Sequence, residues 1–215
     1  MKADVPKQYL KLEGKPILAV TLEKFNGCDL IDGIILVVPA DDQKYCSKEI
    51  VKKYNFNKVL KVTAGGARRQ DSVRAGINAV EGGCENILIH DGVRPFVSQE
   101  LIAASIAALK NERAVITVLP AKDTIKKVSD EGYVLKTYER NYLGLVQTPQ
   151  AFKYDDIYNA HITAEKEGWE EATDDALLME KLEIPVRVIP GEEKNIKITT
   201  PHDLAYAGFL LEKQK

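Results

Sequence analysis

The sequence predicts an α/β fold in which helices cover both faces of a largely parallel sheet. Short, purely apolar runs recur along the 215 residues, and stretches of helical length and period separate them. Runs without polar alternation are typical of strands that are buried on both faces. The clearest run spans 33–39, and another, at 87–89, ends abruptly in a cluster of polar residues. We expect one layered domain, because no repeat, low-complexity tract or linker divides the sequence.

Composition argues against several classes of protein. The 30 Lys and Arg residues nearly balance the 32 Asp and Glu residues, and a formal net charge of -2 disfavours a protein that coats nucleic acid or an anionic membrane. The sequence has no run of about 18 apolar residues and no secretory signal pattern. Cys28, Cys46 and Cys84 fit neither a disulfide framework nor a zinc site. We expect a cytoplasmic, soluble protein without nucleic-acid or membrane partners.

The first part of the chain is predicted to form a βαβ unit. Pro16 suits the first turn of a helix, and Asp41 or Asp42 is the expected cap of the next one. Two strands separated by a helix are expected to run parallel, with a right-handed crossover. The expected elements are, in order, a helix from Pro16 through Phe25, strand 33–39, a helix to about Tyr54 and strand 58–62.

Two glycines follow the second strand of this unit. Gly65 and Gly66 lead into Asp71 and Ser72, at the start of a helix with Val73 on its apolar face. Glycines at a strand end before a helix start can form a site for an anion or a nucleotide, because backbone N–H groups point at the ligand. A plain turn followed by a helix cap explains the same residues about equally well.

The polar cluster after strand 87–89 is the strongest candidate for a functional site. His90, Asp91 and Gly92 follow the strand directly, and Arg94 stands three residues after Asp91. In open α/β sheets, ligands bind beyond the carboxyl ends of the strands. An acid that can hold a cation beside a base that can hold a phosphate suggests a phosphorylated substrate with a divalent metal. A polar turn after a core strand is an equally weighted alternative.

The second half of the chain alternates helices and strands around one hairpin. Ser98 and Thr200 are predicted helix caps, and Asp203 follows Thr200 at the third helical position. Capping also explains most of the acidic cluster Thr173-Asp174-Asp175. The expected elements are helix 99–110, strand 114–119, a hairpin within 124–138, a rigid extended turn at 147–150, helix 154–166, a helix that starts near Ala172, strand 185–189 and a final helix from Pro201.

The hairpin differs in kind from the rest of the chain. Both of its strands alternate polar and apolar residues, and a turn at Asp130-Glu131-Gly132 joins them. An arm that projects from an α/β body often has its apolar face covered by another subunit. We therefore predict a homodimer, with an arm folded back on its own domain as the alternative.

The candidate groups favour phosphoryl or nucleotidyl transfer. The three histidines, His90, His161 and His202, form no recognisable Ser/His/Asp or zinc-binding pattern, and the Walker phosphate-binding motif is lacking. In a site of Lys, Arg and carboxylate, catalysis consists mostly of positioning and charge stabilisation. Mg²⁺ suits one or two carboxylates that share it with substrate phosphates. The candidates are Lys7, Ser72, Asp91, Arg94, Arg140 and Lys197.

Seven motifs, in order and spread over essentially the whole chain, resemble those of the 2-C-methyl-D-erythritol 4-phosphate cytidylyltransferase family of the non-mevalonate isoprenoid pathway. They are 6–9 (PKQY), 65–73 (GGARRQDSV), 90–95 (HDGVRP), 122–124 (KDT), 147–150 (QTPQ), 173–175 (TDD) and 195–199 (NIKIT). The resemblance implies a Rossmann-like, GT-A-like nucleotidyltransferase fold, a three-layer α/β/α sandwich. It also implies one domain, 1–215, with a dimerising β-arm at about 121–146.

The implied reaction joins CTP and methylerythritol phosphate, with release of pyrophosphate. The resemblance implies that Lys7 stabilises charge on the triphosphate, that Asp91 holds Mg²⁺, and that Lys7, Arg140 and Lys197 are catalytic. It assigns CTP binding to Gly65, Gly66, Ser72, Asp91 and Gly92. It assigns the polyol phosphate site to Arg94, Thr148, Thr173 and Lys197, and it has Thr124 and Arg140 reach into the neighbouring subunit's site.

The sequence departs from the family pattern in two places. The family opens with a strand and a glycine-rich loop that ends in Arg-Met, and Met1 aligns with that final Met, so we expect the sheet to lack a strand and the CTP site to lack this loop. Ala67 stands where some members carry an acid near the base. Two alternatives remain open: ribitol-5-phosphate cytidylyltransferase, which shares most of the motifs, and a non-catalytic dimeric nucleotide-binding protein.

Overall fold

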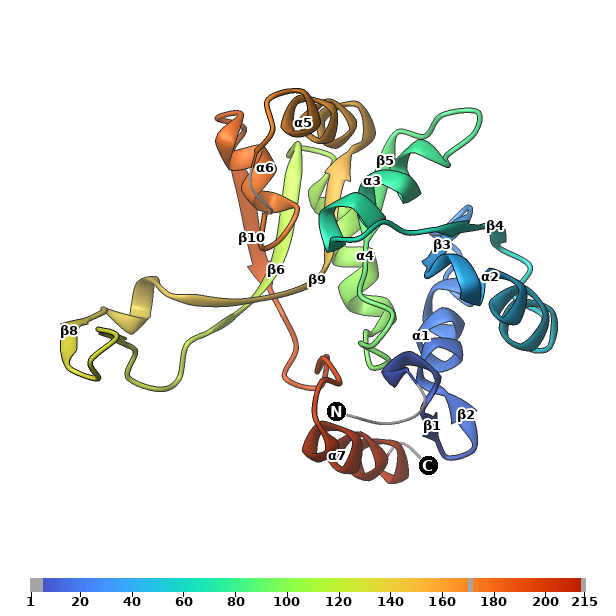
Figure 1. Cartoon of the computed structure of the whole chain (residues 1–215), viewed down its shortest axis with the longest axis horizontal. Helices are drawn as coiled ribbons and strands as arrows, with labels where there is room; N and C mark the ends of the chain where they lie inside the picture. Colours follow the sequence, from blue (N-terminus) through green and yellow to red (C-terminus); the bar gives the residue numbers. More distant parts are fainter. Residues whose placement is uncertain (1–5, 170–171, 214–215) are drawn as a thin grey trace.

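A computed structural model describes residues 6–169 and 172–213 of the chain, and Figure 1 shows how its elements are arranged. Met1, on which the expectation of a missing strand and loop depends, lies outside the described residues. The helices are α1 (Ile17–Asn26), α2 (Gln43–Tyr45), α3 (Arg69–Asn78), α4 (Gln99–Ala108), α5 (Tyr154–Lys166), α6 (Ala176–Lys181) and α7 (Pro201–Glu212), with a π-helical turn, η3 (Cys46–Lys52), and short 3₁₀ turns η1 (Lys7–Tyr9), η2 (Ala40–Asp42) and η4 (Arg140–Tyr142). The strands are β1 (Lys11–Leu12), β2 (Lys15–Pro16), β3 (Ile34–Val38), β4 (Val59–Ala64), β5 (Asn86–Ile89), β6 (Ala114–Pro120), β7 (Lys126–Val128), β8 (Val134–Thr137), β9 (Gly144–Lys153) and β10 (Val186–Pro190).

The main sheet has the strand order β10-β6-β9-β5. β10 runs parallel to β6, while β9 runs antiparallel to both β6 and β5. The main sheet is therefore mixed, and the prediction of a largely parallel sheet is wrong for it, because β9 runs against its neighbours. The prediction of an extended turn at 147–150 is wrong, because these residues lie within β9. The β6–β9 register shifts between Ile116 and Thr117, which pair with Gln150 and Gln147, so Thr148 and Pro149 form a bulge. A bulge accommodates a proline that has no N–H to give to the ladder.

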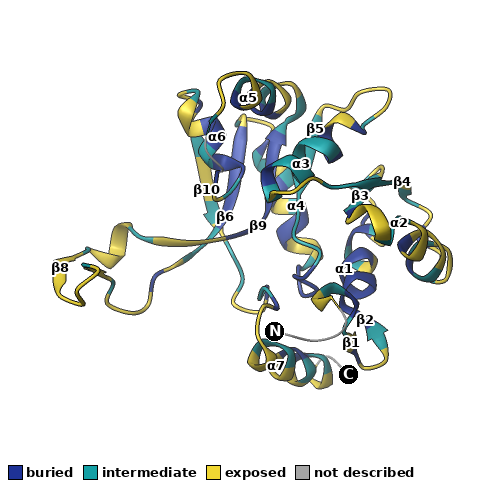
Figure 2. Ribbon diagram, viewed as in Figure 1, coloured by how far each residue is buried: buried dark blue, intermediate teal, exposed yellow. Residues whose placement is uncertain are grey.

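Helices cover both faces of this sheet, as predicted. On one face, Ala114 and Phe152 pack against side chains of α3, α5 and α6 in the largest apolar cluster. On the other face, the neighbouring residues Val115 and Ala151 pack against Leu109, just after α4. Successive residues of a strand point to opposite faces, so β6 and β9 are buried on both sides (Figure 2). The result is the three-layer α/β/α sandwich.

A second, two-stranded sheet stands apart from the main one. β3 and β4 pair in parallel, as the βαβ prediction required, and α3 packs against both. Within the described residues, no strand joins β3 to β5, and a cavity of about 750 Å³ lies between them, lined by residues of both strands. This division explains why β5, predicted to be buried on both faces, is only partly buried.

The helix boundaries test the capping predictions. Ser98 Oγ accepts a hydrogen bond from the Leu101 amide, and Thr200 Oγ1 accepts one from the Asp203 amide, so both predicted caps are confirmed. The predicted cap by Asp41 or Asp42 is wrong. Asp42 makes no capping bond, and its carboxylate instead accepts the Tyr9 hydroxyl at 2.8 Å. The helix after it consists of the short α2 and the η3 turn.

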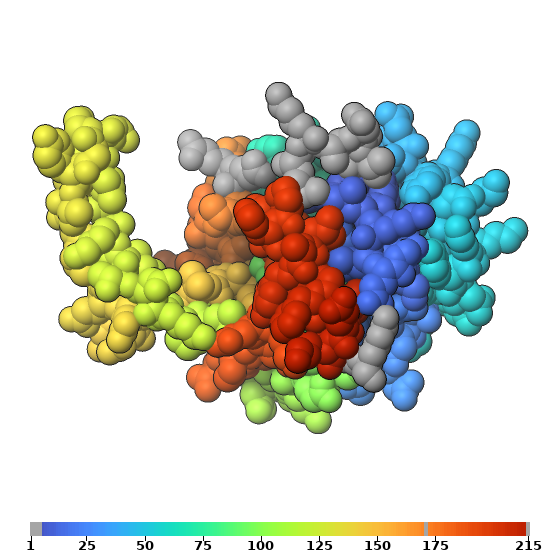
Figure 3. All heavy atoms as spheres, turned by 90° about the horizontal axis from the view of Figure 1, so that it is seen from below, coloured from blue at the N-terminus to red at the C-terminus, as the bar shows by residue number. Residues whose placement is uncertain are grey.

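The predicted hairpin is present and projects from the body. β7 and β8 pair antiparallel, and the arm extends away from the sandwich in two views (Figures 1 and 3). Its apolar side chains are exposed, with Tyr133 at 74%, Val134 at 61% and Leu135 at 59% of full accessibility. The arm is therefore not folded back on its own domain. Of the helices in the described part of the chain, none has the length and apolar character that crossing a membrane requires.

Candidate active site

Asp91 lies directly beyond the carboxyl end of β5 and is surrounded by cations. Its carboxylate lies 2.9 Å from Lys197 Nζ, 3.5 Å from Arg94 Nε and 3.8 Å from Arg69 Nε. Burial raises the pKa of Asp91, but Lys197, Arg69 and Arg94 outweigh it and hold that pKa below its ordinary value. Asp91 is therefore ionised at neutral pH and able to bind a cation. Asp91, Arg94 and Lys197, all predicted from the sequence, thus meet at one place.

A hydrogen-bond relay fixes the backbone of Asp91. The Asp91 amide donates to Thr148 Oγ1 at 3.1 Å, and Thr148 Oγ1 lies 3.1 Å from His90 Nδ1. Burial lowers the pKa of His90 from 6.5 to about 4, so its ring is neutral at pH 7. His90 Nε2 donates to the Arg94 carbonyl, because a carbonyl can only accept. His90 Nδ1 is then the acceptor, and the Thr148 hydroxyl donates to it.

The bulge in β9 positions Thr148 for this relay and also anchors the segment that bears Lys197. Asn195 Nδ2 donates to the Thr148 carbonyl at 2.7 Å, and Gln147 Nε2 donates to the Asn195 carbonyl at 3.2 Å. The same carbonyl accepts Arg94 Nη1 at 2.8 Å. Arg94 and Asn195 are both buried. These bonds hold β9, the Arg94 turn and the Lys197 segment in one fixed arrangement.

The glycine turn after β4 packs tightly against the start of α3. A Cβ atom on Gly65 would lie 2.6 Å from Ser72 Oγ, and one on Gly66 would lie 2.4 Å from the Asp71 side chain. The Gly66 amide donates to Ser72 Oγ at 3.2 Å, while the Asp71 carboxylate accepts the amide and guanidinium of Arg68. The turn-and-cap interpretation is therefore correct. Ser72 also lines the 750 Å³ cavity, together with Asp91 and Gly92.

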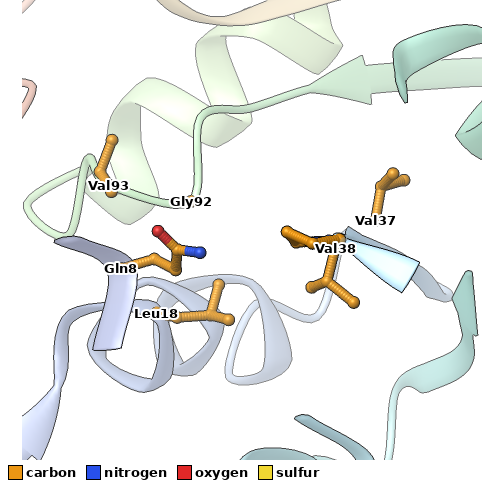
Figure 4. A pocket seen from close by; sticks show the side chains of 7 residues that line it. Gln8, Leu18, Val37, Val38, Gly92 and Val93 are labelled. Carbon is orange, nitrogen blue, oxygen red and sulfur yellow. The ribbon is translucent and has the colours of Figure 1, made fainter. Parts of the chain in front are cut away.

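A second, smaller cavity lies beside the η1 turn that bears Lys7. Lys7 is exposed in η1, and the next residue, Gln8, lines a cavity of about 190 Å³ together with Gly92 and the end of β3 (Figure 4). The loop of Lys7 is thus adjacent to the Asp91-Gly92 turn.

Arg69 and Asp175 are site residues that the sequence reasoning missed. Arg69 Nη2 lies 2.8 Å from Asp175 Oδ2, and Arg69 Nε lies 3.8 Å from Asp91 Oδ1. Capping was predicted to explain most of the 173–175 cluster, and Asp174 does accept the Leu177 amide, but Asp175 makes no capping bond. Thr173, a predicted ligand, is exposed on the same loop. Arg69 belongs to the 65–73 motif, and its place in that motif was the signal from which a role in the site could have been predicted.

The two predicted arm residues are not brought to this cluster within one chain. Thr124 and Arg140 are exposed, and Arg140 Nη1 donates to the Lys122 carbonyl at 2.9 Å. Both belong to the arm, which leads away from the sandwich (Figure 1). A role for either in the chemistry would need the site of another subunit.

The donor set at Asp91 suits a magnesium ion that is shared with a substrate. Within the described residues, no group of three or more His, Cys, Asp and Glu side chains could hold a metal by itself. Asp91 offers one ionised carboxylate with 16% of its side chain exposed. Mg²⁺ is usually held by one or two carboxylates together with substrate phosphates, so this donor set fits.

Comparisons with known proteins identify the family of this chain. The family model for 2-C-methyl-D-erythritol 4-phosphate cytidylyltransferase, IspD, matches residues 1–213. A relative with that name from Geobacter metallireducens is 46% identical, over 99% of this chain and 93% of the relative. Another, from Clostridium acetobutylicum, is 46% identical over 99% of this chain and 92% of the relative. The crystal structure of 4-diphosphocytidyl-2C-methyl-D-erythritol synthase from Anaerococcus prevotii is 37% identical with a TM-score of 0.86, covering 96% of this chain and 90% of that chain. The crystal structure of 2-C-methyl-D-erythritol 4-phosphate cytidylyltransferase from Thermus thermophilus is 33% identical with a TM-score of 0.82, and the match covers 96% of this chain and 94% of that chain. The chain therefore belongs to the 2-C-methyl-D-erythritol 4-phosphate cytidylyltransferase family.

Proposed function

We propose that this protein transfers the cytidylyl group of CTP to 2-C-methyl-D-erythritol 4-phosphate. A phosphate oxygen of the polyol phosphate attacks the α-phosphorus of CTP, and the bond between that phosphorus and the bridging β-oxygen breaks. The products are 4-diphosphocytidyl-2-C-methyl-D-erythritol and pyrophosphate. The observation that supports this most directly is the cluster of Asp91, Arg94 and Lys197 at the end of β5, in a chain of this family.

The two substrates are proposed to occupy opposite sides of Asp91. CTP would lie along the glycine turn, with Gly65, Gly66 and Ser72 at the base and Gly92 at the ribose, where both cavities meet Gly92. The polyol phosphate would lie toward Arg94, Thr148, Thr173 and Lys197. The positive charges of Arg94 and Lys197 would bind its phosphate. The attacking oxygen is thereby held beside the α-phosphorus.

Charge stabilisation is the main chemical task of the site. The leaving pyrophosphate gains negative charge, and Lys7 is proposed to stabilise it from the loop beside Gly92. Asp91 would hold Mg²⁺, which when bound neutralises charge on the triphosphate. Lys197 would stabilise the phosphoryl groups from the other side. Mutual orientation supplies the rest, so no side-chain nucleophile is required.

The exposed arm is proposed to form a homodimer. Tyr133, Val134 and Leu135 present apolar surface that a second copy would cover. In a two-fold symmetric dimer, each arm would contribute equally to the other subunit. Thr124 and catalytic Arg140 would then reach the partner's polyol phosphate site, which explains why they lie far from Asp91 in their own chain.

A substrate panel tests the proposed function. The full chain is incubated with CTP, Mg²⁺ and either methylerythritol phosphate or ribitol 5-phosphate, and pyrophosphate release is measured. We expect release with methylerythritol phosphate. Turnover with ribitol 5-phosphate alone would instead indicate the ribitol enzyme. CTP binding without turnover of either substrate would support the non-catalytic nucleotide-binding protein.

A further inference from the structure

One buried acidic group is left unexplained by the proposed mechanism. Asp175 and His161 each expose 1% of their side chains, and His161 Nε2 lies 3.3 Å from Asp175 Oδ1. Burying a carboxylate is costly unless it is paired. The cation beside Asp175 is Arg69, at 2.8 Å, and Arg69 in turn faces Asp91. The buried carboxylate therefore acts on the site through Arg69.

Of the carboxylates of Asp175 and Asp91, that of Asp175 lies nearer to Arg69. Arg69 Nη2 is at hydrogen-bond distance from Asp175 Oδ2, 2.8 Å, whereas Arg69 Nε stays 3.8 Å from Asp91 Oδ1. A separation of 3.8 Å is too long for a hydrogen bond. Lys197 and Arg94 both approach the other oxygen of Asp91, Oδ2. Arg69 is thus the cation that faces Oδ1 of Asp91, at a distance too long for a hydrogen bond.

The loop that bears Asp175 is fastened on two sides. The Asp175 amide donates to Gln150 Oε1 at 3.1 Å, from the centre of β9. The Ala172 amide donates to Gln70 Oε1 at 2.9 Å, and Gln70 follows Arg69 in α3. Gln70 and Gln150 are both buried. The loop and the start of α3 therefore hold Asp175 and Arg69 in a fixed relation.

We propose that Asp175 is a positioning residue that holds the Arg69 guanidinium away from Asp91 and so keeps Asp91 Oδ1 open for a divalent cation. This inference rests on the proposed function, in which Asp91 holds the metal. Loss of the Asp175 charge removes the nearer of the two carboxylates that face Arg69, which favours the approach of its guanidinium to Asp91, where it would compete with the cation. Removal of the Arg69 charge as well would abolish that competition.

Direct metal binding separates this role from a structural one. Mn²⁺ binding to the full chain in the presence of CTP is followed by EPR, for the wild type, Asp175→Asn, Arg69→Gln and the double variant. We expect Asp175→Asn to weaken Mn²⁺ binding by about 10-fold or more, in the range found when an outer partner of a ligand is lost. We expect the Mn²⁺ affinity of the double variant to return to within about threefold of wild type. The second substitution can restore binding only if Asp175 acts through Arg69.

A matched control removes a carboxylate from another Asp–Arg pair. Asp156 pairs with Arg113 at the start of α5, away from Asp91, and Asp156→Asn should leave Mn²⁺ affinity unchanged. Persistence of the weakened binding in the double variant overturns the proposal, as does wild-type affinity in Asp175→Asn. If Asp175→Asn fails to fold, the Arg69→Gln variant alone provides the test. Weaker Mn²⁺ binding in Arg69→Gln would contradict the proposal, because the loss of a group that competes with the cation cannot weaken cation binding.

Turnover with methylerythritol phosphate is measured on the same samples. If the wild type binds Mn²⁺ with CTP and the double variant recovers its affinity, but the wild type does not turn over, only the proposed function is contradicted. If the wild type turns over but all variants bind Mn²⁺ as tightly as it does, only this inference is contradicted.

Discussion

Lys197 Nζ lies 2.9 Å from Asp91 Oδ2, which pairs a residue of the proposed polyol phosphate site with the residue proposed to hold the metal. On the proposed mechanism, Asp91 would hold the cation that accompanies CTP, and the charge of Lys197 would then serve the phosphate of the second substrate. The proposed half-sites would thus be linked through one ion pair.

Replacement of Lys197 tests its assignment to the polyol side. Lys197→Ala should lower kcat/KM for methylerythritol phosphate by about 100-fold or more, as expected for a lost transition-state charge partner. CTP affinity, measured by calorimetry, should change by no more than about threefold. Lys194→Ala, an exposed lysine of the same segment, is the matched control and should behave as wild type. An equal loss of CTP affinity in Lys197→Ala would show that the half-sites are assigned to the wrong substrates.

Mixed dimers test whether Arg140 serves the partner's site. Arg140→Ala and Asp91→Asn should each abolish turnover as homodimers. Coexpression should restore about a quarter of wild-type activity, because half of the dimers are mixed and each mixed dimer has one intact site. Activity no higher than that of the separate variants would mean that Arg140 acts within its own chain.

The arm should control the oligomeric state. Leu135→Glu places a charge on its exposed apolar face and should weaken dimerisation by about 2 kcal/mol or more, roughly 30-fold in Kd. Analytical ultracentrifugation across a concentration series measures this. Leu60→Glu introduces the same change at an exposed leucine on the body, 72% accessible, and should leave the dimer intact. A wild type that stays monomeric at all concentrations would contradict the assignment of the arm.

Thr148 should stabilise the site through both of its hydrogen bonds. Thr148→Val keeps the shape but leaves the Asp91 amide and His90 Nδ1 without their partner. We expect the free energy of unfolding to fall by about 1–3 kcal/mol, measured by urea denaturation. Thr148→Ser retains the hydroxyl and should recover most of that loss. Equal stability of the serine and valine variants would rule out the relay as a source of stability.

His90 should make the protein less stable in mild acid. Its pKa is about 4 in the folded protein and near 6.5 when unfolded, so the unfolded chain gains a proton first as the pH falls. The stability from keeping His90 neutral is fully present above pH 6.5 and declines toward pH 4, by on the order of 2 kcal/mol for this partly exposed side chain. Urea unfolding at pH 7 and pH 4.5 measures it. The decline should be smaller in His90→Gln, and an identical decline there would assign it to other groups.

Local pattern was enough to predict β3, β4, β5 and the cluster that follows β5. A strand end and its polar residues are adjacent in sequence, so Asp91 and Arg94 could be identified as candidates. β9 was missed around Pro149, because a proline normally argues against a strand that pairs on both sides, and only the bulge opposite β6 accommodates it.

The role of Asp175 could not be predicted from local pattern for a different reason. An acid at the start of a helix is sufficiently explained by capping, and its real partners, Arg69 and His161, come from distant parts of the chain. The Lys197–Asp91 pair is equally non-local, and only the resemblance to the family placed both residues in one site. Long-range ion pairs are set by the tertiary packing of α3, β9 and the 192–198 segment, which a local sequence pattern does not encode.

The most direct test of the proposed activity is ³¹P NMR of the full chain with CTP, Mg²⁺ and methylerythritol phosphate. The proposed cytidylyl transfer predicts that the triphosphate signals and the polyol monophosphate signal decline together, while pyrophosphate and a new cytidine diphosphate ester appear in equal amounts. Pyrophosphate accompanied by CMP, with the polyol phosphate unchanged, would contradict the account, because the cytidylyl group would then have gone to water.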